Sequence, residues 1–297
     1  MKLSVVTVCR NDREGLERTL RSTFESQPSF TDWEQIVVDG ASTDGSRELL
    51  LRWRDHPRMG WWASEPDTGI YNAMNKGLSH ANGDWVLFLN AGDSLLPDVL
   101  GKAFAELSDA DVAYGDMFFA RSPSDFRLVR YPDGSEVTPA FFLFRSLPHQ
   151  AAFISRELLR RAGGYSEDYR IVSDSKFFLD CVLSGTVRFK HFAFPVSVFA
   201  LGGVSTDPDK LEAGLNERVR WLSGVFGESV ARRATFPPAP WWAGDAVCRE
   251  AIRDRGFARL LWTSCRWSRF WWRIAPVRFL LRPLLAIAAR LSRRFRS

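Results

Sequence analysis

Three short runs of β-branched and aromatic residues, each followed at once by polar residues, constrain the fold of this chain most strongly. The runs cover residues 3–8, 35–38 and 85–89. Because they are almost continuously apolar, they predict strands buried on both faces, as in a parallel sheet. Helical spacing of apolar residues lies between them, at Leu16, Leu20 and Phe24 and at Ile70, Met74 and Leu78. We therefore expect an open, mostly parallel, Rossmann-like α/β sheet flanked by helices, which binds ligands beyond the carboxyl ends of its strands.

Acidic and amide side chains gather at these expected strand ends. They are Asp39, Asp44, Asp67, Asn90 and Asp93. Hard oxygen ligands suit Mg²⁺ or Mn²⁺ beside a diphosphate, and these ions usually share their ligands with the substrate. Simpler interpretations also exist, because Asp39 and Asp44 precede glycines as in ordinary turns and Asp93 could cap a helix over residues 94–100.

Motifs of several other classes are missing. No G-x-G-x-x-G follows the first run, and G-K-[ST], H-E-x-x-H and G-x-S-x-G do not occur, so dehydrogenase and ATPase interpretations lose their main support. The four cysteines share no C-x-x-C spacing, which favours neither a zinc ribbon nor a disulfide framework and is typical of a reducing compartment. The first residues lack a long apolar core and a cleavage site, so we expect a cytoplasmic protein that is not exported.

Charge is distributed unevenly along the chain. Residues 255–297 contain 11 arginines and no acidic residue, which leaves 29 basic against 35 acidic residues elsewhere. Tryptophans and leucines alternate with these arginines in two amphipathic stretches separated by Pro276, and neither stretch has 18 uncharged apolar residues in a row. This pattern predicts a helix that lies on an anionic membrane surface. A helix packed on the rest of the protein and a nucleic-acid-binding tail are alternatives, and we do not expect nucleic acid as a partner.

Three linked motifs occur within the first 95 residues. Residues 37–46 read VVDGASTDGS, residues 65–77 read EPDTGIYNAMNKG, and residues 88–93 read FLNAGD. In this order they closely resemble the motifs of the family 2 glycosyltransferases, which have the GT-A fold. Within that family the chain looks most like bacterial enzymes that build O-antigen, capsule or exopolysaccharide repeat units. Weaker similarity continues to about residue 205.

The resemblance implies a donor site in the first motifs. Asp39 matches an acid that hydrogen-bonds the nucleobase of a nucleotide sugar, and Asp67 matches a second position of the nucleoside pocket. Asn75 and Lys76 fall in the segment that lines the donor site, where a lysine can approach phosphate as a point charge.

The third motif matches the metal-binding D-x-D region of the family. In this chain Asn90 stands at the first aspartate and a glycine at the next, so Asp93 is the remaining ionised side chain. The resemblance implies a metal ligand at Asp93, a donor-site residue at Asn90, and Mn²⁺ or Mg²⁺ as the cofactor.

Asp174 matches the family's general base, which lies near the start of an acceptor-side helix. An inverting transferase needs such a base, because the acceptor hydroxyl must lose its proton while it attacks the anomeric carbon. Asp174 could instead cap a helix over residues 174–183. His149 and Gln150 are candidates for the acceptor side, and a structural role for His149 is the alternative.

We therefore predict three parts: residues 1–95 as the donor-binding half of a GT-A domain, residues 96–236 as its acceptor-side half, and residues 237–297 as a Pro-rich linker and basic amphipathic tail. The expected function is inverting transfer from a nucleoside-diphosphate sugar to a lipid-linked saccharide at the inner face of the cell membrane. Two alternatives are an inactive membrane-associated scaffold and a sugar nucleotidyltransferase. The latter would need a basic, Gly-rich phosphate loop after the first strand, which residues 10–13 do not provide.

Overall fold

The computed structural model describes residues 2–122, 125–200, 203 and 208–235. These residues belong to two compact units. One unit comprises Met1–Ser135 and Ser146–Glu217, and the other comprises Glu136–Arg145 and Arg218–Ser297. The predicted linker and tail, residues 237–297, lie outside the described residues.

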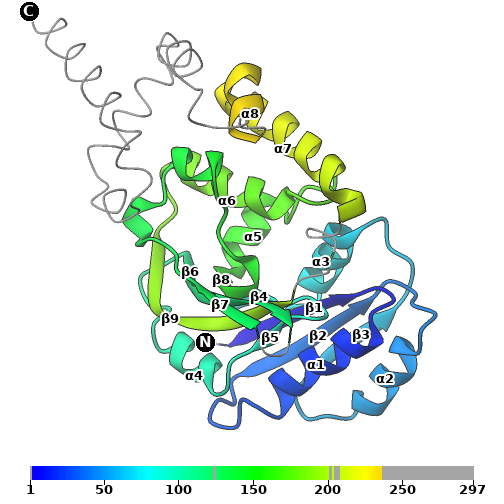
Figure 1. Ribbon diagram of the computed structural model, residues 1–297. Helices are drawn as coiled ribbons and strands as arrows, with labels where there is room; N and C mark the ends of the chain where they lie inside the picture. Colours follow the sequence, from blue (N-terminus) through cyan, green and yellow to red (C-terminus); the bar gives the residue numbers. More distant parts are fainter. Residues whose placement is uncertain (1, 123–124, 201–202, 204–207, 236–297) are drawn as a thin grey trace, which may run out of the picture. The chain divides into compact units, whose positions relative to one another are not determined.

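A nine-stranded sheet organises the first unit (Figure 1). Its strands are β1 (Leu3–Cys9), β2 (Trp33–Asp39), β3 (Met59–Ser64), β4 (Trp85–Phe88), β5 (Ser94–Leu95), β6 (Val112–Ser122), β7 (Asp125–Val129), β8 (Ala152–Ser155) and β9 (Phe189–Ala200). The strand order is β3-β2-β1-β4-β8-β6-β9-β5, and β7 pairs with β6. The three predicted strands are β1, β2 and β4, and every residue in them is buried.

The donor half of the sheet is parallel, as the apolar runs predict. β1 pairs in parallel with both β2 and β4, and β3 continues this part in parallel beyond β2. Beyond β4 the pairing is mixed, because β8 is antiparallel to both β4 and β6, whereas β6 and β9 are parallel. The carboxyl ends of β1, β2 and β4 consequently lie at one edge, where the polar motifs begin.

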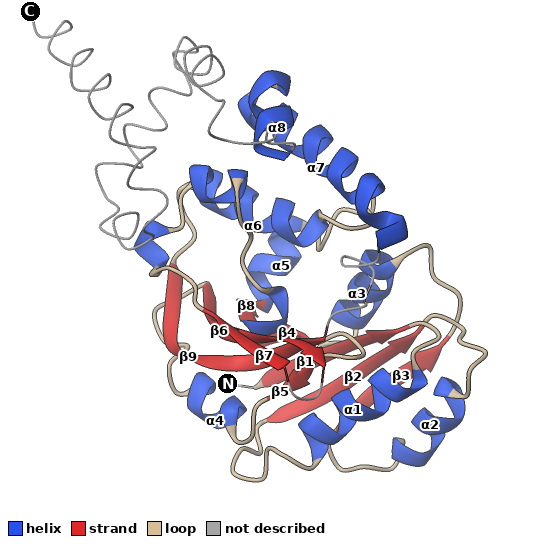
Figure 2. Cartoon of the chain, in the orientation of Figure 1, coloured by secondary structure: helices blue, strands red, loops and turns tan. Residues whose placement is uncertain are grey.

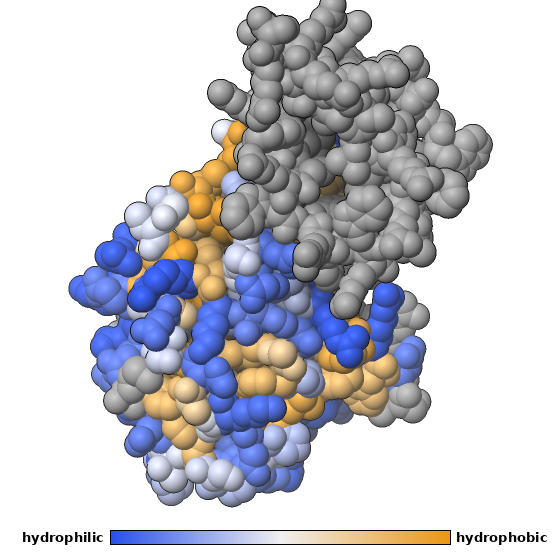
Figure 3. All heavy atoms as spheres, turned by 90° about the vertical axis from the view of Figure 1, so that its left-hand side faces the viewer, coloured by the Kyte–Doolittle hydropathy of each residue, from blue (hydrophilic) through white to orange (hydrophobic). Residues whose placement is uncertain are grey.

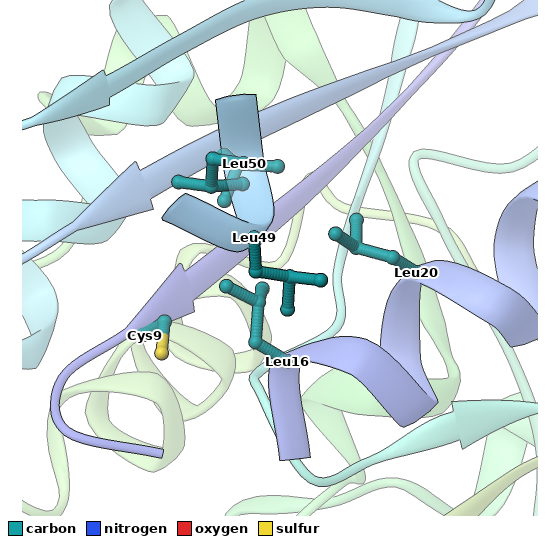
Figure 4. Packing of buried hydrophobic residues seen from close by; sticks show 6 residues of the cluster. Cys9, Leu16, Leu20, Leu49 and Leu50 are labelled. Carbon is teal, nitrogen blue, oxygen red and sulfur yellow. The ribbon is translucent and has the colours of Figure 1, made fainter. Parts of the chain in front are cut away.

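Helices cover both faces of this parallel part (Figure 2). Over all the described residues of both units, the helices of the chain are α1 (Arg13–Phe24), α2 (Ser46–Trp53), α3 (Ile70–Ser79), α4 (Val99–Phe104), α5 (Arg156–Ala162), α6 (Ser173–Ser184), α7 (Leu211–Phe226) and α8 (Glu228–Thr235), and those on the parallel part are α1, α2 and α3. α3 packs so closely on one face that a side chain at Gly77 would clash with Val6. On the opposite face, α1 and α2 bury a cluster of leucines (Figure 4), which are Leu16, Leu20, Leu49 and Leu50.

The helix expected over residues 94–100 is wrong. Ser94 and Leu95 instead form strand β5, because their backbone groups pair with β9, and α4 begins only at Val99. Asp93 therefore caps no helix. The helix expected over residues 174–183 is confirmed as α6, which begins at Ser173, so Asp174 lies inside its first turn and is not its N-cap residue.

The second unit, as far as it is described, joins the segment around Phe142 to the part of α7 from Arg218 onward and to α8. Arg218 Nη2 donates a hydrogen bond to the carbonyl oxygen of Phe142 at 2.9 Å, and α8 contacts the same segment. Among the described residues of the whole chain, no helix combines the length and the apolarity that crossing a bilayer requires. Hydrophobic and hydrophilic side chains are interspersed on the described part of the face in Figure 3.

Candidate active site

Asp39 organises the turn that follows β2. Its side chain is completely buried, and its carboxylate accepts hydrogen bonds from the Ser42 hydroxyl, from Ser42 N at 3.1 Å and from Ser64 Oγ at 2.6 Å. These donors satisfy a carboxylate that would otherwise be costly to bury. Asp39 thus holds the turn after β2 to the end of β3, and its contact with a nucleobase stays a prediction.

Asp67 lies beside this turn, next to a cation that the sequence did not single out. Its Oδ1 accepts a hydrogen bond from Gly69 N at 2.9 Å and lies 3.9 Å from Nη1 of Arg10. The Arg10 side chain is 65% exposed, whereas that of Asp67 is 5% exposed. Any side chain at Gly40 would clash with Asp67 Oδ2, so glycine keeps this corner open. Arg10 is the first residue after β1, and this place at a strand end was the one sequence signal that pointed to it.

Asp44 has the turn role that was one of its two interpretations. It accepts hydrogen bonds from Arg13 N at 2.7 Å and from both the backbone and the hydroxyl of Ser46. Burial raises the pKa of this carboxyl, but these hydrogen bonds to its charged form outweigh burial and lower the pKa. Asp44 therefore joins the start of α2 to the first residue of α1.

The side chains of Lys76 and Asn75 are occupied by contacts within the protein. Lys76 Nζ lies 2.7 Å from a carboxylate oxygen of Glu65 and donates to the Pro66 carbonyl oxygen at 2.8 Å. Asn75 pairs with the backbone of Tyr165 through both ends of its amide, at 2.8 and 2.9 Å. Lys76 thus supports the segment that leads to Asp67. Asn75 ties α3 to the loop before α6, and a donor contact for either residue remains a prediction.

Asp93 is the buried carboxylate of the third motif. One of its oxygens accepts a hydrogen bond from Ala200 N at 3.1 Å, and its side chain is almost inaccessible to solvent. Burial raises the pKa of Asp93 to about 7, although the nearby His149 opposes this shift. A buried carboxylate with few donors around it is one that a bound cation would stabilise.

The residues around Asp93 fit a cation that the donor helps to hold. Asn90 Oδ1, three residues before Asp93, is buried and has no hydrogen-bond partner among the residues that the structure describes. Mg²⁺ and Mn²⁺ are often bound through one or two protein oxygens, with phosphate and water completing the shell. Within the described residues, no three acidic, histidine or cysteine side chains gather to form a cage by themselves. The protein can therefore supply part of a coordination shell, with Asp93 and Asn90 as its members.

Asp174, His149 and Asn90 form one hydrogen-bonded chain that Tyr71 completes, and we call these four residues the Asp174 network. His149 Nδ1 lies 2.9 Å from Asp174 Oδ2, and His149 Nε2 lies 3.2 Å from Asn90 Nδ2. The Tyr71 hydroxyl lies 3.0 Å from Asp174 Oδ1 and 2.8 Å from the Ile171 carbonyl oxygen. The structure thus joins a predicted donor-site residue to the predicted base.

Electrostatics within the Asp174 network favour an ionised Asp174. Burial raises the pKa of Asp174, but the hydrogen bond and charge of His149, with smaller contributions from Ser175 N and Tyr71, lower it overall. Burial lowers the pKa of His149, and the carboxylate of Asp174 reverses this and raises it. Each partner therefore stabilises the charged form of the other.

Two further residues of this region are Gln150, which was predicted from the sequence, and Tyr71, which was not. Gln150 follows His149 in the sequence and is buried, and its acceptor-side role stays a prediction. Tyr71 was not predicted from the sequence, although it lies inside the second motif. It precedes Asp174 by 103 residues, and no spacing rule connects positions so far apart.

α3 holds the loop that leads into α6, the helix on which Asp174 lies. Besides the Asn75 contacts, Asn72 Nδ2 donates to Glu167 at 3.0 Å, and Asn75 donates to the other oxygen of Glu167 at 3.1 Å. Gly164 has φ +78°, and a side chain there would press on the Asn75 amide. Because α3 begins directly after the Asp67 segment, one short helix links the donor-side motif to the position of the base.

Comparison with known proteins identifies the class to which this chain belongs. Residues 4–160 match the model of the family described as "Glycosyl transferase family 2". The chain belongs to this family, and it is a glycosyltransferase with a GT-A-like α/β fold.

Particular relatives agree with this assignment. The chain is 34% identical over 192 residues to an uncharacterized glycosyltransferase, MT1564, of Mycobacterium tuberculosis, with 61% of this chain and 69% of the relative covered. Its fold is similar to that of Staphylococcus aureus TarS 1-349 in complex with UDP-GlcNAc, with a TM-score of 0.60 and 18% identity over 87% of this chain and 75% of that one. It is also similar to the mannosyltransferase PcManGT of Pyrobaculum calidifontis in complex with GDP-Man and Mn²⁺. The TM-score is 0.55, with 22% identity and coverage of 97% and 80%.

Proposed function

We propose that this glycosyltransferase moves a sugar with inversion from a nucleoside diphosphate to an acceptor hydroxyl, with Asp174 as the general base. The observation that carries the proposal is the Asp174 network, which links an ionised, buried carboxylate to Asn90 at the donor-side strand end. Inversion in a single displacement needs a base on the acceptor side. The donors in the two similar structures, UDP-GlcNAc and GDP-Man, support a nucleotide sugar as the donor class.

The reaction follows from these placements. The acceptor O–H bond breaks, its proton passes to a carboxylate oxygen of Asp174, and the oxygen forms a bond to the anomeric carbon. The bond between that carbon and the diphosphate oxygen breaks at the same time, and the electron pair leaves with the nucleoside diphosphate. A divalent cation held by Asp93 and Asn90 would supply charge stabilisation to the departing diphosphate.

The acceptor and the location extend this proposal. The family resemblance supports a saccharide of surface polysaccharide synthesis, and the basic, tryptophan-containing sequence of residues 255–297 supports a lipid-linked acceptor. We place the enzyme at the cytoplasmic face of the cell membrane on this argument. Of the two alternatives, family membership disfavours a sugar nucleotidyltransferase, whereas an inactive scaffold is distinguished by experiment.

A nucleotide screen tests the donor class. We expect one of UDP, GDP, CDP or dTDP to raise the melting temperature of the full chain, and the matching nucleotide sugar to be turned over, because a ligand that binds only the folded state stabilises it by mass action. The measurement combines a thermal-shift assay with detection of the released nucleoside diphosphate, each with and without Mn²⁺. Stabilisation without any turnover of any nucleotide sugar would support the scaffold and contradict the proposed function.

Removal of residues 255–297 tests the membrane proposal. We expect the truncated protein to bind nucleotide normally and to lose flotation with anionic liposomes. Relative to the full chain, its transfer to a membrane acceptor should fall more than its transfer to a soluble analogue. The physical reason is that a surface-bound enzyme meets an acceptor in the bilayer at a higher effective concentration. Neutral liposomes serve as one control, since they lack the anionic lipid that attracts arginine. Added salt serves as another, because attraction to anionic lipid falls as salt screens it. Equal flotation of both forms would show that the tail has a different role.

A further inference from the structure

Asp174 does not stand alone in the fold. Both of its carboxylate oxygens have partners, the Tyr71 hydroxyl at Oδ1 and His149 Nδ1 at Oδ2. The side chains of His149 and Asp174 are only 16% and 14% exposed. A hydrogen bond between two side chains so well shielded from water fixes their relative orientation.

We propose that His149 is a positioning residue, whose Nδ1–H holds the carboxylate of Asp174 toward the acceptor while Asn90 fixes the ring through Nε2. This inference rests on the proposed transfer reaction, and it assigns to His149 a role different from acceptor contact. It also makes the third motif part of the machinery that places the base, since Asn90 replaces an aspartate of the D-x-D pattern.

The proton positions follow from the partners. An ionised carboxylate only accepts hydrogen bonds, so the nitrogen that faces Asp174, Nδ1, carries a proton. The amide nitrogen of Asn90 only donates, so the Nε2 atom that faces it accepts. When the ring is neutral, the form with its proton on Nδ1 satisfies both contacts. Nε2 is therefore the single ring position that could take a further proton, and it is turned toward Asn90.

Two roles for His149 can be separated by its substitutions. An asparagine can place an N–H where Nδ1 stands, but it cannot take up a proton as imidazole does. His149→Asn should therefore preserve a positioning role and abolish a proton-accepting role. His149→Phe removes both roles while it retains a planar ring.

We expect His149→Phe to lower kcat by about 10- to 100-fold, because a hydrogen bond to a charged group is lost, and to leave the donor Kd unchanged. His149→Asn should recover most of this loss. In His149→Phe the acidic limb of the kcat–pH profile should move to higher pH, since the N–H that stabilises the carboxylate is gone. The other groups that face the pair are unchanged in both variants; they are Tyr71, Tyr165, Asp93 and the backbone N–H of Ser175.

His191 provides a matched control. Its Nε2 lies 2.8 Å from Oδ1 of the buried Asp116, and its side chain is 14% exposed, so this pair resembles the His149 pair in burial and in contact. It lies on β9 and β6 and has no part in the proposed chemistry. His191→Phe and His191→Asn should leave the kcat–pH profile in place, whatever they do to the melting temperature.

Each outcome decides the proposal. Equal and large losses in His149→Asn and His149→Phe would overturn it in favour of proton uptake by His149, and wild-type kinetics in both would show that His149 positions nothing. Nitrogen-15 NMR of the wild-type histidine rings needs no turnover and covers the case in which His149→Phe does not fold. A His149 ring protonated at Nε2 alone would contradict the inference. Absence of transfer by the wild type would instead refute the proposed function, with the NMR test still informative.

Discussion

Replacement of Asp174 by asparagine is expected to lower sugar transfer by at least about 10²-fold, because a positioned base contributes about 10² to 10⁴ to such a rate. Asparagine keeps the size of the side chain and can still pair with Tyr71, but it cannot accept the acceptor proton. Donor binding should persist, since the base acts on the acceptor hydroxyl. Single-turnover kinetics and calorimetry with the nucleotide would measure the two quantities separately.

Asp180 offers a control on the same helix. It is half exposed and pairs with Lys176 four residues earlier, so Asp180→Asn removes one carboxylate from α6 without touching the Asp174 network. Transfer should be unaffected by this change. Normal transfer by Asp174→Asn would place the base elsewhere, and a loss of nucleotide binding would show that Asp174 supports the fold of the donor site.

Replacement of Asp93 by alanine is expected to abolish donor turnover while the protein remains folded. Asp93 is the carboxylate of the motif that resembles a metal site. Without it, the neutral Asn90 amide oxygen would bind a cation more weakly than the two side chains together. The extra thermal stabilisation that Mn²⁺ gives to the nucleotide complex should also disappear in the variant. Unchanged turnover at saturating Mn²⁺ would refute the assignment.

Asp93 also predicts a pH dependence of stability. The pKa of this carboxyl is raised from 3.8 to about 7, so between these values the folded protein binds more protons than the unfolded chain. The free energy of unfolding of the metal-free protein should therefore receive a destabilising contribution from Asp93 that grows as pH rises from about 4 to 7. Asp93→Asn should remove this contribution.

Denaturant unfolding of the metal-free protein at about pH 5 and about pH 8 measures the effect, because the slope of stability with pH reports the difference in bound protons. Asp55 is a suitable control carboxylate, since its side chain is 87% exposed. Asp55→Asn should leave the difference between the two pH values unchanged. An equal difference in wild type and Asp93→Asn would contradict the prediction.

The parallel half of the fold was predictable from local pattern. The runs that became β1, β2 and β4 are apolar throughout because both faces of these strands are covered, and such runs leave few other structures. The motifs that follow these runs identify the family for a related reason: each motif is a contiguous stretch of sequence at one strand end, so it can be read without knowledge of the packing. The prediction of a helix over residues 94–100 was wrong, because Ser94 and Leu95 pair with β9, which lies about a hundred residues later in the chain.

The sequence by itself determined the class of fold, the family and the positions of Asp93 and Asp174 in their motifs. Only the tertiary structure decided what these side chains meet. Tyr71, Asn90, His149 and Asp174 come from four separate segments. Their hydrogen bonds exist because α3, the end of β4, the short helix His149–Ala151 and the start of α6 converge. It likewise decided that Asn75 pairs with Tyr165 rather than standing free. Contacts between distant segments depend on packing, and no local spacing of residues encodes them.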